Sequence, residues 1–247
     1  MVKQGFRLLF MGVLMATLLS AIVGCDTVDK KATEPILTQL SDKYGKSFSV
    51  YALGDRIDKD TATAFVFADD DPTMLFVARV TSGGDLVFEN YAYRSICRKV
   101  ETKINAAFTA FGIETECFTD FSSVNNSVSP DASVESYIKD SASEHVIATI
   151  IAKDGNGIGG DNLTEVYCAL YSQLSGINLS TALYVLTSDD YDAVAEKGRH
   201  ETQVFDAYRL EVSGAGQTIK ELHIMVTQDG LSLSASEMDE VLAKGVD

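Results

Sequence analysis

The sequence predicts an α+β fold in two small domains, each with an antiparallel or mixed sheet and with helices packed on one face. Segments rich in aromatic and β-branched residues are separated by short turns, whereas other segments repeat apolar residues at helical spacing. Hydrophobic residues make up 46% of the chain and charged residues 23%, which is typical of a folded protein. The order of elements in the second half is also compatible with a small three-layer α/β unit.

The N-terminal domain is expected over residues 35–121. Pro35 suits the first turn of a helix that ends at Gly45. Three strand-like segments follow, and the short links between them favour antiparallel pairing. These predicted strands cover residues 48–53, 61–68 and 73–80.

The clearest helix in the sequence precedes Gly112. Its apolar residues recur at intervals of three and four, which places them on one face that needs a flat apolar partner. The preceding sheet can supply that partner. The residues of this stripe are Tyr93, Ile96, Cys97, Val100, Ile104, Ala107, Phe108 and Phe111.

A stretch rich in Ser and Asn, residues 122–132, contains Pro130 and predicts a linker between the domains. The C-terminal domain is then expected over residues 133–247. Alternating residues around the glycines at 214 and 216 indicate a β-hairpin. The predicted elements are helices at 133–139, 163–174 and 236–243, and strands at 145–152, 183–187, 203–212 and 219–227.

The first 25 residues carry a pattern of their own. Lys3 and Arg7 precede an apolar run that ends in Ile22-Val23-Gly24-Cys25. This pattern resembles a bacterial lipoprotein signal peptide. The resemblance implies that residues 1–24 are removed and that Cys25 carries a lipid. The apolar run is shorter than the ~20 residues that cross a bilayer, which disfavours a permanent transmembrane anchor.

The same resemblance predicts the protein's location and its main partner. Lipid on Cys25 would anchor the chain to the extracytoplasmic face of the cell membrane, and residues 25–34 would form a tether. The formal net charge of −16 argues against nucleic-acid partners, because these require clusters of Lys and Arg. An anionic lipid surface repels such a chain for the same reason, so attachment would depend on the lipid.

A glycine-rich loop at residues 154–161 is the first candidate for chemistry. Gly155, Gly157 and Gly160 match the Gly-x-Gly-x-x-Gly pattern that binds dinucleotides, between a predicted strand and a predicted helix. The acidic residue expected ~20 positions later is missing, since Asp189 lies further along the chain. An ordinary loop is therefore the preferred interpretation.

The same loop is a candidate calcium site. Asp154, Asn156, Gly159 and Glu165 match conserved positions of an EF-hand loop. Ile158 stands where an oxygen ligand is expected, so the match is partial. The candidate calcium ligands are Asp154, Asn156, Asp161 and Glu165. No other cofactor is expected.

Three cysteines remain once Cys25 is assigned to the lipid. They show no Cys-x-x-Cys spacing, which argues against a metal cage. Cys97 lies on the apolar face of the predicted helix and is expected to be a buried thiol. Cys117 and Cys168 are the candidates for a disulfide between the two halves.

No nucleophile elbow, Walker loop or Ser-x-x-Lys box occurs, so no catalytic residue is assigned. The sequence predicts a membrane-anchored, non-enzymatic binding or assembly module of the cell envelope, with an envelope protein as a possible partner. The alternative is an envelope hydrolase with dispersed carboxylates, because such sites are assembled only by folding.

Overall fold

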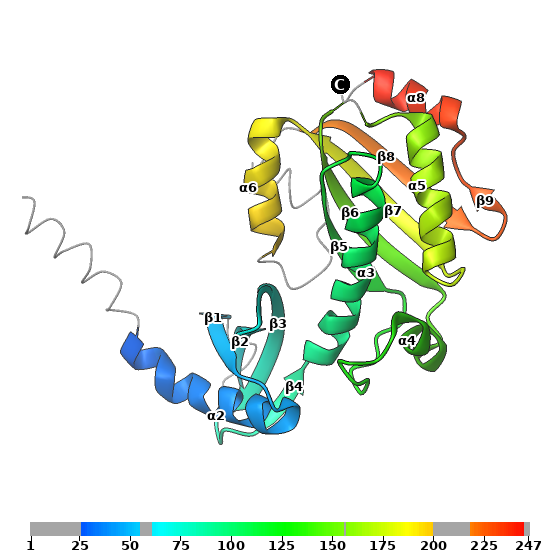
Figure 1. Ribbon diagram of the computed structural model, residues 1–247. Coiled ribbons are helices and arrows are strands. Elements are labelled where there is room, and N and C mark those ends of the chain that lie inside the picture. The colour runs from blue at the N-terminus through cyan, green and yellow to red at the C-terminus, as the bar shows by residue number, and fades with distance from the viewer. Residues whose placement is uncertain (1–25, 55–60, 156, 200–217, 245–247) are drawn as a thin grey trace, which may run out of the picture. The chain divides into compact units, whose positions relative to one another are not determined.

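The computed structural model describes residues 26–54, 61–155, 157–199 and 218–244 (Figure 1). The chain divides into two compact units. Unit 1 runs to Asp70 and resumes at 77–89, whereas unit 2 contains 71–76 and the chain from Asn90 onward. Each unit holds one sheet with packed helices, which confirms the α+β class. Within the described residues, no helix is long and apolar enough to cross a bilayer.

Unit 1 holds most of a four-stranded sheet in the order β1-β2-β3-β4, of which the first six residues of β3 belong to unit 2. β1 and β2 pair antiparallel, as predicted, and β3 also pairs antiparallel with β4. The fourth strand was not predicted, because it is short and follows directly on a glycine turn. The elements are α2 (Asp26–Tyr44), β1 (Phe48–Leu53), β2 (Thr61–Ala68), β3 (Asp71–Thr81) and β4 (Leu86–Glu89).

Helix α2 begins at Asp26, so most of the expected tether is helical, and Pro35 lies inside the helix and not in its first turn. Burial explains why the helix continues past a residue without an N–H group: Ile36 and Leu40 are fully buried. The Gln39 side chain donates to the Gly84 carbonyl (2.6 Å) and accepts from the N–H of β4 (3.0 Å). These bonds tie α2 to the edge of the sheet.

Unit 2 is built on a five-stranded mixed sheet in the order β5-β6-β7-β8-β9. β6 and β7 are parallel and the other pairs are antiparallel. The strands are β5 (Thr115–Phe121), β6 (His145–Lys153), β7 (Asn178–Leu186), β8 (Thr218–Thr227) and β9 (Gly230–Leu231). The helices are α3 (Tyr91–Thr109), α4 (Val134–Ser141), α5 (Gly160–Gln173), α6 (Ser188–Arg199) and α8 (Ala235–Lys244).

The chain thus divides at a different place from the one expected. Residues 122–132, interpreted as a linker between domains, join β5 to α4 inside unit 2. β5 is hydrogen-bonded to β6 along its length, from Thr115 opposite Ala152 to Phe121 opposite Val146. The polar composition of 122–132 is therefore that of a surface loop within one unit.

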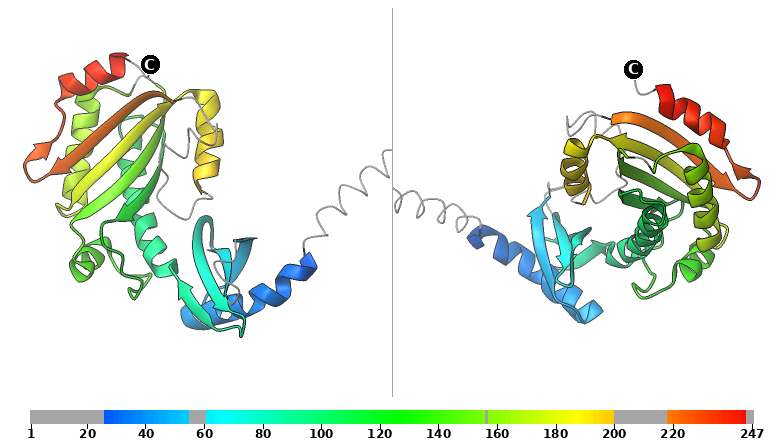
Figure 2. Two further views of the ribbon diagram at one scale, coloured as in Figure 1. Left: turned by 180° about the vertical axis from the view of Figure 1, so that it is seen from behind. Right: turned by 45° about the horizontal axis from the view of Figure 1, so that its top comes forward.

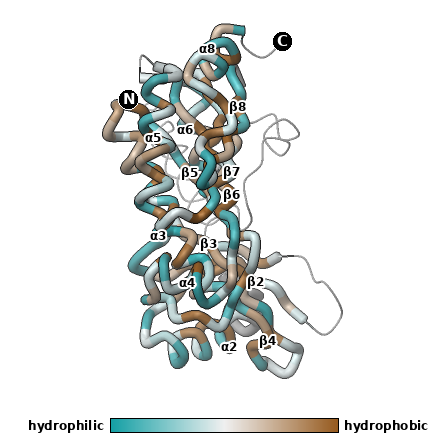
Figure 3. Tube along the Cα trace, turned by 90° about the vertical axis from the view of Figure 1, so that its right-hand side faces the viewer, coloured by the Kyte–Doolittle hydropathy of each residue, from teal (hydrophilic) through white to brown (hydrophobic). Residues whose placement is uncertain are grey.

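Helices cover both faces of this sheet, in the three-layer arrangement that the sequence left open for the second half. Figure 1 shows α3 and α5 in front of the sheet, and Figure 2 shows the sheet from behind. Residues such as Ile150 and Leu183 pack with α3, α4, α5 and α8. Ile151 and Tyr184 face the other way and pack with α6. β6 and β7 are rich in hydrophobic residues because both of their faces are buried (Figure 3).

Other sequence predictions differ from the structure in detail. β5 and α6 were not predicted, because Glu, Asp and Thr interrupt their apolar patterns. β7 begins at Asn178, earlier than the predicted strand at 183. β8 confirms the strand predicted at 219–227, whereas its expected hairpin partner at 203–212 lies outside the described residues.

A buried ion pair fixes α3 against β5. Arg94 and Glu101 are 8% and 2% exposed, and their side chains meet at 3.1 Å. Arg94 also donates to the Thr119 carbonyl (3.0 Å), and the Thr119 N–H donates to Glu101 (3.0 Å). The two charges thus pair with each other and both bind Thr119 of β5, which determines how the helix lies on the strand; Glu101 also pairs with Arg98 (3.7 Å).

Removing one charge of this pair is expected to destabilise the protein more than removing both. Glu101→Leu leaves a buried guanidinium without its counter-ion, at a cost of about 3–5 kcal/mol. The double variant Arg94→Met/Glu101→Leu leaves no buried charge and should lose less than either single variant. Urea denaturation of the four proteins measures this, and a double variant that loses the sum of both single losses would contradict it.

Candidate ligand-binding cavity

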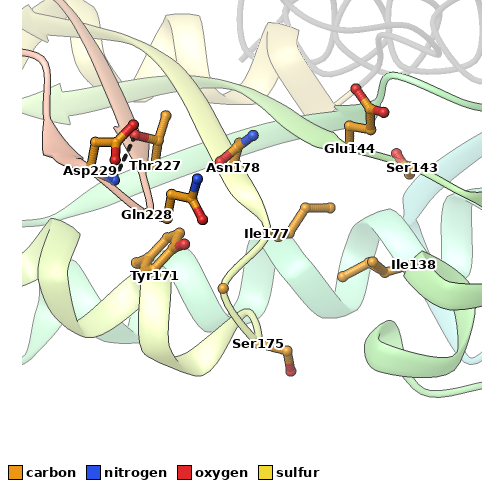
Figure 4. A pocket seen from close by; sticks show the side chains of 11 residues that line it. Ile138, Ser143, Glu144, Tyr171, Ser175, Ile177, Asn178, Thr227, Gln228 and Asp229 are labelled. Atoms are coloured by element: carbon orange, nitrogen blue, oxygen red, sulfur yellow. Dashed lines mark hydrogen bonds between the residues drawn. The ribbon is translucent and has the colours of Figure 1, made fainter.

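A cavity of about 570 Å³ opens at one end of the five-stranded sheet in unit 2 (Figure 4). Its volume lies within the range of ~300–1,000 Å³ that is typical of small-molecule sites. The lining residues come from three separate loops, the strand ends beside them, and helices α4 and α5. They are Ile138, Ser143, Glu144, Tyr171, Ser175, Gly176, Ile177, Asn178, Thr227, Gln228 and Asp229.

The sheet topology brings these loops together. β6 and β7 are parallel, with His145 opposite Asn178, so both strands begin at the same end of the sheet. β8 is antiparallel to β7 and therefore ends there, with Val226 opposite Leu179. α5 carries the chain back from the end of β6 to the start of β7, so its C-terminal end also lies at the cavity.

The backbone of the cavity wall is unusual. Among the described residues, Ala142 (φ 51°) and Ser175 (φ 59°) are the two non-glycine residues with positive φ, and Ser175 is followed by Gly176 (φ 75°). The left-handed conformation costs a non-glycine residue about 1–2 kcal/mol. Ser175 lines the cavity and Ala142 precedes a residue that does. Both positions close the end of a helix, where a left-handed residue is common, so this backbone fixes where α4 and α5 stop beside the cavity.

Part of the polar lining is held in place by the protein. The Ser143 hydroxyl lies 3.2 Å from that of Ser122 and donates to the His145 carbonyl (3.3 Å). The Thr227 hydroxyl accepts from the Asp229 N–H (3.2 Å), which fixes the turn before β9. These bonds shape the wall and use the Ser143 hydroxyl, whereas the Thr227 hydroxyl keeps its own proton to donate.

The remaining polar side chains of the lining are available. In the described part of the chain, no hydrogen-bond partner is found for the side chains of Glu144, Asn178 and Gln228. Figure 4 shows the amide groups of Asn178 and Gln228 near each other, beside the ring of Tyr171. Ile177 is 7% exposed and supplies apolar surface between these groups and Ile138. The cavity therefore combines some apolar surface with polar side chains that have no partner within the described protein.

The structure does not form the predicted calcium site from the residues it describes. Asp154 pairs with Lys220 (3.6 Å), whereas Asp161 and Glu165 are exposed on α5. Asn156 lies outside the described residues. Within the described ranges, no group of three or more His, Cys, Asp and Glu side chains is placed to hold a metal. The reason is that α5 begins at Gly160, midway through the twelve residues that an EF-hand loop wraps around its ion.

The glycine loop joins β6 to α5, as a dinucleotide site requires. The backbone N–H that would bind a phosphate there is instead hydrogen-bonded to an Asp side chain of the protein. The Gly160 N–H at the start of α5 donates to the Asp239 carboxylate of α8 (2.7 Å), where a phosphate would otherwise accept. A Cβ atom on Gly160 would lie 2.0 Å from the Ala235 carbonyl oxygen, and one on Gly157 would lie 2.8 Å from that of Phe111. These glycines therefore allow close packing of α3, α5 and α8.

The predicted disulfide is absent, since Cys97, Cys117 and Cys168 are free thiols. Cys117 is buried in the core beneath α3, whereas Cys168 is exposed on α5. Burial raises the pKa of Cys97 to about 12 and that of Cys117 well above its ordinary value, so both stay protonated and unreactive. Cys25, the predicted lipid site, lies outside the described residues.

Sequence reasoning singled out none of the cavity residues. Glu144, Asn178 and Asp229 are far apart in the chain: Glu144 and Asp229 lie in polar loops beside strand ends, and Asn178 is the first residue of β7. No spacing motif links them, because only the pairing of three strands brings their loops together.

No family model and no curated protein matches the sequence. A solved structure with a similar fold is the crystal structure of a DUF5037 family protein from Ruminococcus gnavus. It has a TM-score of 0.66 and 13% sequence identity, and the match covers 85% of this chain and 98% of that one. At this identity the likeness shows the fold alone.

Gly160→Ala is expected to destabilise the protein by about 1–3 kcal/mol, because the added methyl group collides with the backbone at Ala235. Gly155→Ala is the matched control, since its Cβ would meet its nearest neighbour, the Lys153 carbonyl oxygen, at 3.9 Å. Denaturant midpoints of both variants measure the difference. Equal midpoints would show that α8 does not restrict the start of α5.

Proposed function

We propose that the protein is a lipid-anchored, extracytoplasmic binding module of the cell membrane, and that its cavity binds a small polar ligand. Anchoring rests on the pattern Ile22-Val23-Gly24-Cys25 after a basic and apolar segment. Binding rests on one observation, the cavity of about 570 Å³ at the end of the sheet. Together they describe a protein that holds a ligand close to the membrane surface.

The cavity supports binding because its polar groups remain available. An amide or carboxylate without a protein partner exchanges hydrogen bonds with water until a ligand replaces that water. Asn178 and Gln228 offer both donors and acceptors, which suits a polar ligand with mixed chemistry. The strained turn at Ser175 and Gly176 positions the wall before a ligand arrives, which reduces the cost of binding.

Binding without chemistry is favoured over hydrolysis. The Ser143 hydroxyl is directed to a backbone carbonyl and another hydroxyl, and no histidine lines the cavity to activate it. The hydrolase alternative retains one supporting observation, that Glu144 and Asp229 line the same cavity. The hydrolase alternative requires that the ligand in the cavity be converted into a product, whereas a binding module releases its ligand unchanged.

The anchor is tested by metabolic labelling of producing bacteria with an alkyne analogue of palmitate. We expect label on the wild-type chain and none on Cys25→Ser, which should also leave the membrane fraction. Cys168→Ser removes an exposed thiol of the folded part and is the matched control, so it should keep the label. Label that persists on Cys25→Ser would overturn the anchoring proposal.

The cavity is tested by native mass spectrometry of the full chain purified gently from its own membranes. We expect a co-purified small molecule on the wild type and on Thr102→Trp, which changes an exposed residue of α3. Gln228→Trp fills the cavity and should abolish the adduct. The same adduct on all three proteins would place binding elsewhere, and conversion of the released molecule on re-addition would favour the hydrolase.

A further inference from the structure

The charges that line the cavity are all of one sign. Glu144 and Asp229 contribute carboxylates, and the lining contains no Lys, Arg or His. Within the described residues, neither carboxylate pairs with a cation of the protein. Both are exposed, so they face the cavity and its solvent without a fixed counter-ion. A ligand that brought positive charge would supply the missing partner.

Two helix ends add to this negative potential. α4 ends at Ser141 and α5 ends at Gln173, and the residues that follow each end line the cavity. The C-terminal end of a helix carries a partial negative charge, which favours a cation. Lys139 in the last turn of α4 and the Lys103 ammonium at the Gln173 carbonyl offset part of this charge. The two carboxylates are therefore the main source of negative charge at the cavity.

The basic groups nearest to the cavity are engaged or outside it. The Lys103 ammonium donates to the Gln173 carbonyl (3.0 Å) at the end of α5, and it pairs with Glu135 (3.3 Å). Lys139 is exposed on the last turn of α4, and His145 follows Glu144 at the start of β6. None of these three is among the lining residues. They leave the cavity itself without positive charge.

The remaining lining suits the apolar part of an amine. Ile177 and Ile138 provide an aliphatic surface, and the half-buried ring of Tyr171 lies beside it (Figure 4). An aromatic ring attracts an ammonium group, and apolar surface favours an alkyl chain. Glu144 and Asp229 stand at opposite ends of the cavity in Figure 4, which suits a ligand with an ammonium group at each end.

We propose that the cavity binds an aliphatic diamine or polyamine, with its ammonium groups at Glu144 and Asp229 and its alkyl chain along Ile177. This inference rests on the proposed binding function and names the chemical class of its ligand. The overall formal charge of −16 draws the same class of molecule toward the protein from solution.

The test compares three probes that share an eight-carbon chain: 1,8-diaminooctane, 1,8-octanediol and suberate. Each is titrated calorimetrically into the full chain in detergent. We expect the diamine to bind at least about tenfold more tightly than the diol or the diacid, and more weakly as salt is raised. Glu144→Gln/Asp229→Asn should weaken diamine binding at least about fivefold.

The matched control is Asp161→Asn/Glu165→Gln, which removes the same two residue types and the same charge from the exposed surface of α5. It should leave diamine binding unchanged. Equal weakening by both double variants would overturn the proposal, because attraction would then follow net charge alone. If the diol or suberate binds tightly and Gln228→Trp abolishes that binding, the cavity is supported as a binding site but the amine as its ligand class is overturned. Absence of binding by all three probes, together with an adduct unaffected by Gln228→Trp, would overturn both proposals.

Discussion

The parallel pairing of β6 and β7 is the constraint on which unit 2 depends. Each strand is buried on both faces over most of its length, although Ile147 near the start of β6 is 42% exposed. A parallel pair requires a crossover, and α5 makes it against the same core that receives α3 and α8. The start of α5 is in turn restricted, because Gly160 lies against the backbone of Ala235 with no room for a side chain.

The same pairing accounts for both ends of the sheet. At the end where β6 finishes, the glycine loop and the Asp239 carboxylate close the start of α5, so a position suited to an anion is occupied by the protein itself. At the opposite end the two strands begin, two helices end and β8 turns toward β9, and the cavity opens between these loops. One end of the sheet is thus used for packing, and the cavity opens at the other.

Charge is distributed differently in the core and at the cavity. In the core, Arg94 and Glu101 satisfy each other and Thr119, so α3 is attached to β5 by a neutral pair. At the cavity, Glu144 and Asp229 have no such partner within the described residues. A buried charge must be paired for the chain to fold, whereas an exposed one can remain free for a partner.

The sequence by itself determined the α+β class, the first three strands, the long helix from Tyr91 and the terminal helix, because each shows a periodic apolar pattern that local chemistry imposes. It also determined the signal-like segment that predicts a lipid on Cys25. It did not show β5 or α6, because polar residues interrupt their apolar patterns. It also did not show the unit division, because residues 122–132 have the composition of a linker but lie inside unit 2. Only the tertiary structure decided the cavity, because strand pairing brings together residues as distant in sequence as Glu144 and Asp229. It also decided that the start of α5, after the glycine loop, binds Asp239 of α8.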